Sequence, residues 1–556
     1  MSASTKKKLR KEENAAKLTE KQLNEQKEAK KLKGYTVIFA VVVCLVLVAA
    51  VVIMGTTAFN NSGIKQRKTD ALTVGNHTLN NAELNYFYID AVNEFYSDYN
   101  EQYGEYAAMY MSLMGFDTTL PLNKQVYYGS EDGTTYADVF TEEAITKATG
   151  AYAIYDMAVA SGHTLSSELQ ANLESNIAMA GMYATAYGYS NLGDYLKALY
   201  GPGATEETYR TYLEVLAIAD SFQANYYDSL SYDDAAIAAH GAENYDKFSS
   251  FSYIQYVVDV DDFIVCADPD NTEHTHSEEE IAAAQAAAQA AADSLAAGTY
   301  TSTEELDNAI NALDVFVGAE KKEVSNAYEG VFYENINADV AAWLVEADRT
   351  AGEAAAIPYY YTSTVDGAET STLSSFYLIV FQGREDNNMN LVNVRHILAN
   401  FKGGTTDPTT GVTTYTDVEK KEALDRITEI MEQWKADGAT EDAFIALASK
   451  SEDAASSANG GLCENVFPGQ MVASFNDWCF DPQRQAGDYE IVESEYGYHL
   501  MYFSSTNDIT FRNYMIENVL RNEEFENWYS TATEAMDVKV LNTKYLSLDL
   551  VLGAGQ

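Results

Sequence analysis

Two histidines that could share one site, His396 and His499, lie about a hundred residues apart in short apolar segments. His396 is in the middle of VRHIL (residues 394–398), and His499 is in YGYHLMYF (residues 496–503); both patterns predict β-strands. A single histidine on a strand is most often a satisfied core residue. Two of them at the ends of one module, with a Gly-Gly pair and the word GQM between them, favour a shared polar site instead.

The segments between the two histidines predict the elements that would position them. Residues 418–438 have the pattern of a helix, and a second short helix ends in LAS at residues 447–449. SEDAASSANGG (residues 451–461) and PGQMVASFNDWCF (residues 468–480) follow. This order of elements and words resembles the parvulin family of peptidyl-prolyl cis/trans isomerases. The resemblance implies a small four-stranded antiparallel sheet wrapped by helices.

The resemblance also implies roles for individual residues. His396 and His499 match the paired central histidines of the family. Asp453 matches the acidic position before the Gly-Gly pair, and Ser494 falls where a hydroxyl usually lies. The pocket for the proline ring would be lined by four residues: Met471, Phe475, Cys463 and Phe480. Cys463 departs from the pattern, because a Leu or Met normally completes this pocket.

Isomerisation of an X-Pro bond would make a limited demand on these residues. The barrier to rotation is about 18–20 kcal/mol, the cis and trans forms differ by only about 0.5–1 kcal/mol, and no bond is made or broken. A catalyst therefore needs only to bind the twisted amide more tightly than the planar one. An apolar pocket would hold the ring and exclude water, beside a fixed polar wall formed by the histidines, Asp453 and Ser494. No metal, nucleotide or covalent cofactor is expected in this module.

The charge of the chain is strongly acidic. Its 556 residues carry a formal net charge of −49, although residues 1–34 hold eleven Lys or Arg against five Glu. This balance argues against a nucleic-acid-binding protein, which needs a cationic surface, and indicates a soluble, self-repelling body. A chain of this length has room for three or more domains.

Residues 35–58 predict a single transmembrane anchor. No charged residue occurs from 34 to 64, and residues 35–54 form a nearly continuous apolar run of the length, about 20 residues, that spans a bilayer as a helix. The basic segment 1–34 would keep the N-terminus in the cytoplasm and place the rest outside. A cleaved signal peptide is the alternative, although its apolar core would be only about 7–15 residues long. Lipoprotein attachment through Cys44 is disfavoured, since Val43 precedes it.

Cysteine and histidine clusters elsewhere give weaker signals. Four cysteines are too few for a disulfide framework. Cys463 and Cys479 could pair in an oxidising compartment, but free thiols are the favoured interpretation. His274 and His276 lie in an acidic loop near Cys266 and could bind a divalent metal. A solvated polar loop is favoured, because nothing fixes a fourth ligand.

Residues 69–248, after a linker at 59–68, predict a mainly helical domain. Residues 72–74 have the pattern of a short strand, and Asn80-x-x-Glu83 is a capping box that opens a helix. Further amphipathic helices are expected at residues 137–161, 165–188, 191–199 and 205–229. Their order, with words such as VGNHTLNNAEL, resembles the helical chaperone domain of the SurA/PrsA group of extracytoplasmic foldases. The resemblance implies binding of unfolded secreted proteins, and a C-terminal helix (511–535, within 507–556) that folds back on this domain.

The first helix of this domain carries a row of tyrosines. From Ile89 to Leu113, apolar or tyrosine residues recur every three or four positions, so they are expected to share one helix face. A core seam with hydroxyls at its rim is the favoured interpretation. A tyrosine-rich cradle for unfolded segments is the functional alternative, since tyrosine offers a wide amphipathic contact area.

Residues 249–385 predict a second, diverged parvulin-like domain before the isomerase domain at 386–506. Three residue types recur with one offset: Trp343, Arg349 and Gly352 match Trp478, Arg484 and Gly487. FYLIVF (376–381) ends the earlier copy as YHLMYF (498–503) ends the later one. Tyr377 takes the place of His499, and SYIQYVV (252–258) has no histidine, so this copy would bind rather than catalyse. An accidental match of spacing is the alternative.

These patterns together predict an α+β multidomain protein that acts as a membrane-anchored foldase outside a Gram-positive type of cell. Its partners would be unfolded or partly folded secreted proteins and the membrane, with no nucleic acid. Two rival functions fit the same domains: a holdase whose parvulin folds bind without turnover, and a surface scaffold in which they act as spacers. Nothing in the sequence indicates an oligomeric state.

Overall fold

The computed structural model describes residues 62–552, apart from residues 266–275, 317–323, 347, 366–367 and 409. The basic segment 1–34, the predicted anchor 35–58 and His274 lie outside the described residues. Among the helices that are described, none is both long and apolar enough to cross a membrane. By its contacts the described chain divides into two units, residues 62–230 with 521–552 and residues 231–520.

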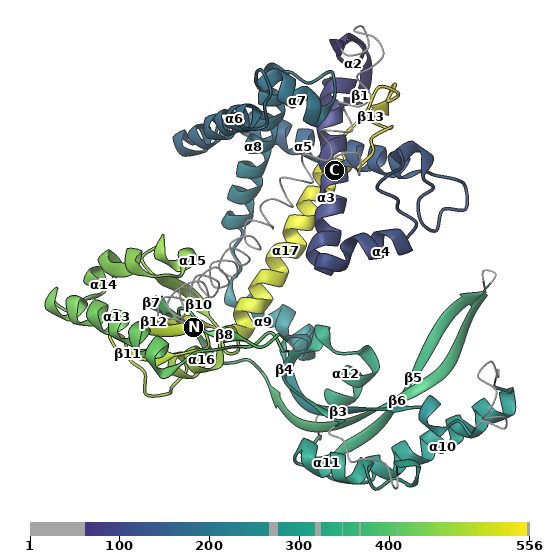
Figure 1. Cartoon of the computed structure of the whole chain (residues 1–556), viewed down its shortest axis with the longest axis vertical. Helices are drawn as coiled ribbons and strands as arrows, with labels where there is room; N and C mark the ends of the chain where they lie inside the picture. Colours follow the sequence, from purple (N-terminus) through teal and green to yellow (C-terminus); the bar gives the residue numbers. More distant parts are fainter. Residues whose placement is uncertain are drawn as a thin grey trace, which may run out of the picture. The chain divides into compact units, whose positions relative to one another are not determined.

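The first unit is mainly helical and carries a small three-stranded sheet (Figure 1). In this sheet β1 (Asp70–Val74) lies between β2 (His77–Asn80) and β13 (Val538–Val540) and is antiparallel to both. The predicted capping box opens α3 (Asn81–Tyr103), because the Asn80 side chain accepts the Glu83 amide at 3.1 Å while the Glu83 carboxylate accepts the Asn80 amide at 2.9 Å. The other helices are α2 (Ile64–Lys68), α4 (Ala107–Leu113), α5 (Tyr136–Ser161), α6 (Ser167–Ala186), α7 (Leu192–Tyr200) and α8 (Glu206–Ser229).

The tyrosine row does not form one continuous helical face, so that prediction is wrong. α3 ends at Tyr103, where Gly104 adopts a φ of +54° and a 3₁₀ turn precedes α4. Tyr99 and Tyr103 pack against the core of the unit. Leu113, beyond the break, is 69% exposed. The seam is therefore part of the core only in its first half.

The C-terminal segment completes the first unit. Trp528 of α17 (Phe511–Glu534) stacks on Tyr226 of α8, with ring centroids 4.2 Å apart. Beyond α17, β13 pairs with β1, and the Leu122 amide donates to the Leu550 carbonyl at 3.0 Å. Residues 231–520 are therefore an insertion between two segments that build one unit.

The second unit contains two four-stranded antiparallel sheets with equivalent strand orders, β4-β3-β6-β5 and β10-β7-β12-β11. In each sheet the first and last strands along the chain form the central pair. The first group of elements is β3 (Ser250–Asp259), α10 (Glu278–Ala296), α11 (Thr303–Ile310), β4 (Asn326–Phe332), α12 (Ala338–Leu344), β5 (Ala354–Val365) and β6 (Ala368–Glu385), preceded by α9 (Asp234–Glu243). The second is β7 (Asn390–Asn400), the hairpin β8 (Thr405–Thr406) and β9 (Thr413–Thr414), α13 (Asp417–Ala436), α14 (Glu441–Leu447), α15 (Ala454–Ser457), β10 (Leu462–Val466), α16 (Ala473–Cys479), β11 (Tyr489–Glu493) and β12 (Gly497–Thr510).

The same arginine–tryptophan contact recurs beside both sheets. The Arg349 guanidinium lies 4.0 Å from the ring centroid of Trp343, and that of Arg484 lies 4.1 Å from that of Trp478. In both cases the arginine Nε donates to the carbonyl of the same tryptophan at 3.0 Å. These matched contacts favour the interpretation of the two sheets as copies of one fold.

The strand registers identify what stands in the first sheet at the positions of the two histidines. Tyr377 occupies on β6 the register position that His499 occupies on β12. Tyr377 lies opposite Val257, and His499 lies opposite Leu398. Gln255 and His396 each lie two residues before these partners, so Gln255 on β3 corresponds to His396 on β7. The first sheet therefore presents a carboxamide and a phenol where the second presents two imidazoles.

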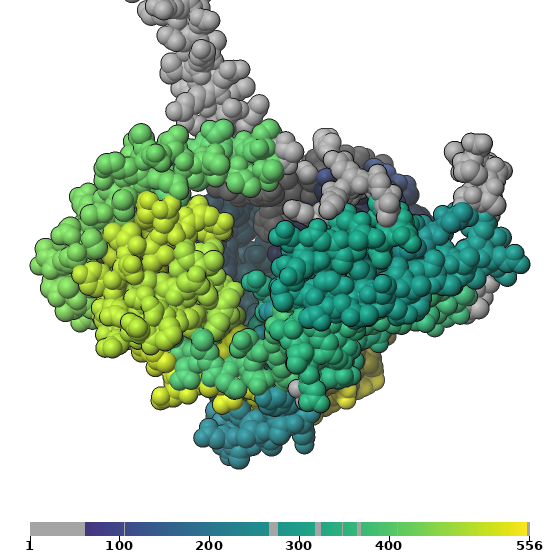
Figure 2. Space-filling view, turned by 90° about the horizontal axis from the view of Figure 1, so that it is seen from below, coloured from purple at the N-terminus to yellow at the C-terminus, as the bar shows by residue number. Residues whose placement is uncertain are grey.

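The second sheet buries both of its faces. One face packs on α13 and α14, through Ile397, Leu500, Trp434 and Phe444. The other packs on α16, through Val394, Met501, Phe475 and Trp478. In the space-filling view, the green residues that include α13 and α14 curve around the yellow-green residues of the following strands (Figure 2). Because side chains alternate along a strand, His396 and His499 lie on the α16 side.

Candidate active site

The central strands of the second sheet bring His396 and His499 into contact. β7 and β12 are antiparallel neighbours, and the residue opposite His396 is two positions from His499, so the two histidines are diagonal neighbours on one face. Their Nδ1 atoms are 3.2 Å apart and their ring centroids 5.4 Å apart. Both side chains are buried, with 7% and 4% of their surface exposed.

Three further polar side chains extend this pair into a hydrogen-bonded row. At one end, Ser494 Oγ lies 2.7 Å from His499 Nε2. At the other end, His396 Nε2 lies 3.1 Å from Asp453 Oδ2 and 2.9 Å from Ser456 Oγ. The Ser456 hydroxyl also hydrogen-bonds Asp453 Oδ2. The row therefore runs from Ser494 through both imidazoles to Asp453, and Ser456 bridges its last two members.

Hydrogen-bonding rules assign one direction to the protons of this row. A carboxylate can only accept, so the Ser456 hydroxyl donates to Asp453 and its oxygen accepts the Nε2–H of His396. A neutral imidazole has a single N–H, so His396 Nδ1 accepts the Nδ1–H of His499. His499 Nε2 then accepts the hydroxyl of Ser494. Every hydrogen atom of the row points toward Asp453.

Burial keeps both histidines uncharged. It lowers the pKa of His396, although the neighbouring Asp453 carboxylate acts in the opposite direction. It lowers the pKa of His499 to about 4, and the charge that His396 would carry adds to this shift. Removal from water penalises the charged form of an imidazole. At neutral pH the pair is therefore a fixed arrangement of dipoles and carries no net charge.

Asp453 is held as a carboxylate by its position as the N-cap of α15. It accepts the backbone amides of Ala455 and Ser456, each at 3.2 Å. Partial burial acts to raise the pKa of Asp453, but the hydrogen bond from the Ser456 hydroxyl and those from the amides lower it below its ordinary value. The end of the row thus carries a full negative charge.

The Gly-Gly pair lets the chain after α15 return against β7. Gly461 has a φ of +77°, and its carbonyl accepts the His396 amide at 2.9 Å. A Cβ at this position would lie 2.6 Å from the carbonyl oxygen of His396, so glycine is required. The close approach fixes the backbone of His396 beside the segment that carries Asp453.

The four residues predicted to line a proline pocket lie in or against one apolar cluster on the histidine side of the sheet: Phe475, Met471, Cys463 and Phe480. Phe475 is edge-on to both imidazoles, with centroids 5.4 Å from His396 and 5.6 Å from His499. An open hollow of about 630 Å³ adjoins this region, lined by Ser494 and by Val472 and Ser474 near the start of α16. The binding role of these residues stays a prediction.

The two cysteines of this domain are free thiols in the structure, so the alternative disulfide is not formed. Burial raises the pKa of Cys463 to about 11 and that of Cys479 to about 12. Both are therefore protonated at neutral pH and are poor nucleophiles. Across the described residues, no three or more His, Cys, Asp or Glu side chains gather where a metal ion could bind.

Ser456 is the contact residue that the sequence did not single out. The residue is 5% exposed, and its hydroxyl hydrogen-bonds both His396 and Asp453. The signal that could have identified it is the Asp-x-x-Ser spacing, since an N-cap carboxylate meets the residue three positions later.

Comparison with known proteins identifies the module that holds this site. The family model of the PPIC-type PPIase domain matches residues 376–505. Among solved structures, the chain is similar to the peptidylprolyl isomerase PrsA from Bacillus anthracis (19% identity over 27% of this chain and 59% of that one, TM-score 0.17). It is similar to PrsA from Bacillus cereus as well (23% identity over 30% of this chain and 56% of that one, TM-score 0.15). It is also similar to PrsA from Bacillus subtilis (11% identity over 75% of this chain and 95% of that one, TM-score 0.26). The matches thus span less than two thirds of the first two structures. No curated protein sequence matches the chain.

Proposed function

Because residues 376–505 are a PPIC-type, or parvulin-type, peptidyl-prolyl isomerase domain, we propose that this chain catalyses cis/trans isomerisation of X-Pro peptide bonds. The observation that carries the proposal is the neutral pair His396 and His499, hydrogen-bonded between Ser494 and Asp453 and faced by the ring of Phe475. No charged nucleophile is needed for the reaction, and the thiols of this domain are protonated.

The polar row would stabilise the twisted amide. Rotation removes the amide resonance, so charge moves from the carbonyl oxygen back to the nitrogen as the barrier is reached. Dipoles that are already fixed by hydrogen bonds respond to this change without reorganising, which favours the transition state over the planar ends. In this proposal Ser494 and Asp453 hold the two imidazoles in one tautomeric arrangement, and the imidazoles face the rotating bond.

The apolar wall would hold the ring and exclude water. Phe475 lies edge-on to both imidazoles, so a pyrrolidine placed against the apolar cluster that contains it would lie beside the polar row. Met471 adds a flexible side chain that adapts to neighbouring shapes. Cys463 supplies a smaller, neutral side chain at the position that Leu or Met usually fills.

A second candidate function, binding without turnover, is favoured by one observation for the first sheet. Gln255 and Tyr377 stand there at the positions of the histidine pair. A phenol and a carboxamide retain bulk and hydrogen bonding but not the doubled imidazole. We therefore propose residues 249–385 as a binding or spacer module and residues 386–506 as the source of all isomerase activity.

The helical unit and residues 35–58 suggest where this activity is used. The proposal is a foldase held by a single membrane-spanning segment on the outer face of the cytoplasmic membrane, which receives unfolded secreted chains. Uncatalysed X-Pro isomerisation takes tens to hundreds of seconds, long enough for an exported chain to misfold.

An isomerisation assay on the segment 59–556 tests the proposal. Unlabelled X-Pro peptides of known cis content would be followed by NMR exchange spectroscopy, with and without protein. Acceleration that disappears in the double variant His396→Ala, His499→Ala supports the enzyme. No acceleration by the unaltered segment, together with suppressed aggregation of an unfolded client, would identify a holdase.

A further inference from the structure

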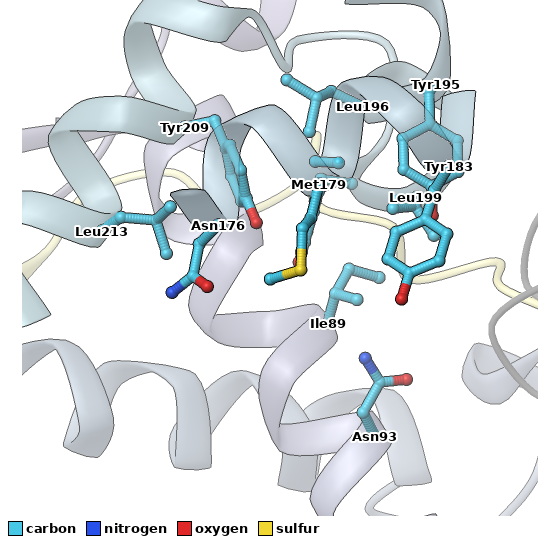
Figure 3. A pocket seen from close by; sticks show the side chains of 12 residues that line it. Ile89, Asn93, Asn176, Met179, Tyr183, Tyr195, Leu196, Leu199, Tyr209 and Leu213 are labelled. Carbon is cyan, nitrogen blue, oxygen red and sulfur yellow. The ribbon is translucent and has the colours of Figure 1, made fainter. Parts of the chain in front are cut away.

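The open hollow beside Ser494 has charged side chains in its lining. Its volume is about 630 Å³, and the charged residues that line it are Lys420 in the first turn of α13 and Glu493 and Glu495 on either side of Ser494. A cavity of about 310 Å³ in the helical unit, in contrast, is lined by aromatic, aliphatic, thioether and amide side chains and by no charged one (Figure 3). Of these two spaces, the hollow beside Ser494 is the one that can discriminate between ligands by charge.

Two of the three charges in the hollow neutralise each other. The Lys420 ammonium donates to Glu493 Oε1 at 2.6 Å, and the Tyr498 hydroxyl donates to Glu493 Oε2 at 2.9 Å. The hydrogen bond between Lys420 and Glu493 raises the pKa of the ammonium and lowers the pKa of the carboxyl. Both groups are therefore ionised at neutral pH, and Lys420 is already matched to a carboxylate instead of being open to an anionic ligand.

Glu495 supplies the charge that stays unmatched. Its side chain is exposed, and within the described part of the chain it forms no hydrogen bond or ion pair. A carboxylate accepts hydrogen bonds but cannot donate them. The ammonium or guanidinium group of a ligand would therefore find a partner at Glu495, whereas a carboxylate or phosphate group would be repelled.

The turn that carries Glu495 is fixed to the end of the polar row. Ser494 Oγ lies 2.7 Å from His499 Nε2 and accepts the Tyr496 amide at 3.2 Å. The Ser494 amide donates to the Gly497 carbonyl at 2.8 Å, which closes the turn. Adjacent Cα atoms are about 3.8 Å apart. The backbone thus holds the Glu495 carboxylate within one side chain's length of the row.

The residue before the proline is the part of a substrate that this carboxylate would meet. In the proposed function the apolar cluster around Phe475 holds the pyrrolidine ring, and the polar row faces the rotating carbonyl. That carbonyl belongs to the residue before the proline, so the side chain of this residue starts on the side of the row. A lysine or arginine at this position could reach an exposed carboxylate while its aliphatic stem stays against apolar surface.

We propose that Glu495 is a specificity-determining residue, which makes the isomerase domain prefer X-Pro bonds in which X is lysine or arginine. The inference rests on the proposed function and names the substrate class of that site. Glu495 has no part in the rotation itself, because it acts on the side chain next to the rotating bond.

Two peptides of identical composition test this preference: acetyl-Ala-Lys-Pro-Ala-Ala-Ala-amide and acetyl-Ala-Ala-Pro-Ala-Ala-Lys-amide. Both carry one positive charge, so attraction to the acidic protein as a whole acts on both alike. With the full chain in nanodiscs of zwitterionic lipid, NMR exchange spectroscopy would give kcat/KM for each peptide. The expected ratio is about threefold in favour of lysine before the proline, the size of one exposed ion pair. The ratio should approach one as the ionic strength rises from about 0.02 M to about 0.5 M.

Substitutions link the ratio to Glu495. Glu495→Gln should bring the ratio close to one, and Glu495→Lys should invert it, because like charges then repel each other. The matched control Glu429→Gln removes an equal charge from an exposed position of α13, more than two turns beyond Lys420, and should leave the ratio at about threefold. A ratio near one in the unaltered chain, or an unchanged ratio in Glu495→Lys, would overturn the proposal.

Peptide binding separates a failure of this inference from a failure of the proposed function. Dissociation constants of the same two peptides, measured from the broadening of their NMR signals, should differ by about threefold and respond in the same way to Glu495→Lys. If neither peptide is isomerised, the proposed function fails, and the dissociation constants still decide the preference. If both peptides are isomerised but bind and react equally, the preference fails and the isomerase assignment stands.

Discussion

The Nδ1 atoms of His396 and His499 lie 3.2 Å apart, close enough to share a single hydrogen atom. If both nitrogens carried a proton, the two N–H groups would point at each other. The arrangement is therefore stable only when one ring donates and the other accepts. Because Ser456 and Asp453 hold Nε2 of His396 as a donor, His499 is the ring that donates between them.

The histidine pair should be essential for isomerisation. His396→Ala and His499→Ala should each lower kcat/KM by about tenfold or more, because each removes one preorganised dipole from a site that excludes water. The double variant should lose about as much as the more damaging single variant, because the two rings act as one unit. The measurement is NMR exchange spectroscopy of an X-Pro peptide.

His163→Ala is the matched control for this pair. His163 hydrogen-bonds Ser221 at 2.8 Å in the helical unit and should be replaceable without loss of isomerase rate. An equal loss in this control would mean that the assay reports folding of the chain instead of the site.

Ser456 should control the proton arrangement of the row. Ser456→Ala removes the acceptor at 2.9 Å and the hydroxyl that lowers the pKa of Asp453. The expected result is a loss of kcat of about three- to tenfold, the size of one ordinary hydrogen bond, and altered ¹⁵N shifts of the His396 ring. Ser457→Ala is the neighbouring control, because the exposed Ser457 hydroxyl donates to the Ala454 carbonyl at 3.2 Å. Identical spectra and rates in both variants would remove Ser456 from the site.

Stability of the second unit should fall as the pH falls from about 6.5 to about 4. The pKa of His499 is lowered by burial from 6.5 to about 4, so the unfolded chain binds a proton in this interval that the folded chain refuses. For this one group the full interval corresponds to roughly 3 kcal/mol. The lowered pKa of His396 acts in the same direction.

Urea unfolding at several pH values, followed by tryptophan fluorescence, measures this dependence. Asp453 also loses stabilising interactions in acid, but at pH values below its ordinary pKa of 3.8, so the two effects occupy different intervals. The double variant His396→Gln, His499→Gln removes both titrating rings and should flatten the slope between pH 4 and 6.5. A slope that persists in this variant would assign the effect to other groups.

The arginine–tryptophan contacts should contribute equally in the two sheets. Arg484→Lys and Arg349→Lys each remove an Nε hydrogen bond of 3.0 Å and the stacking of a planar guanidinium. Each should lower the free energy of unfolding by about 1–2 kcal/mol. Arg210→Lys, at an exposed ion pair with Glu174, should leave the free energy of unfolding nearly unchanged. A large cost in one sheet and none in the other would argue that the two contacts only look alike.

Local patterns in the sequence predicted the elements well where local physics decides them. The capping box at Asn80 and Glu83 opens a helix as expected, because both partners lie within one turn. The expected helices 137–161 and 205–229 correspond to α5 and α8 within one residue at each end. The break after Tyr103 was missed because a glycine within a periodic pattern is compatible with both a continuing and an ending helix.

The composition of the site could be predicted more fully than its internal geometry. Short motifs in the order typical of the parvulin family predicted four of its residues: His396, Asp453, Ser494 and His499. The structure brings these four side chains into one hydrogen-bonded row. Ser456 was not predicted, since its contact with His396 joins residues on a helix and a strand that no local pattern relates. The direction of the protons follows only from distances between side chains. The roles of these residues in catalysis are still to be measured.

The pairing of β13 with β1 has a consequence for biosynthesis. Synthesis begins at the N-terminus, so Leu72 of β1 is made 468 residues (540 − 72) before Val540, the residue opposite it on β13. The helical unit therefore stays incomplete while residues 231–520, which contain both four-stranded sheets, are synthesised. Until β13 has been synthesised, one edge of β1 is unpaired, and an unpaired strand edge is prone to pair with other chains.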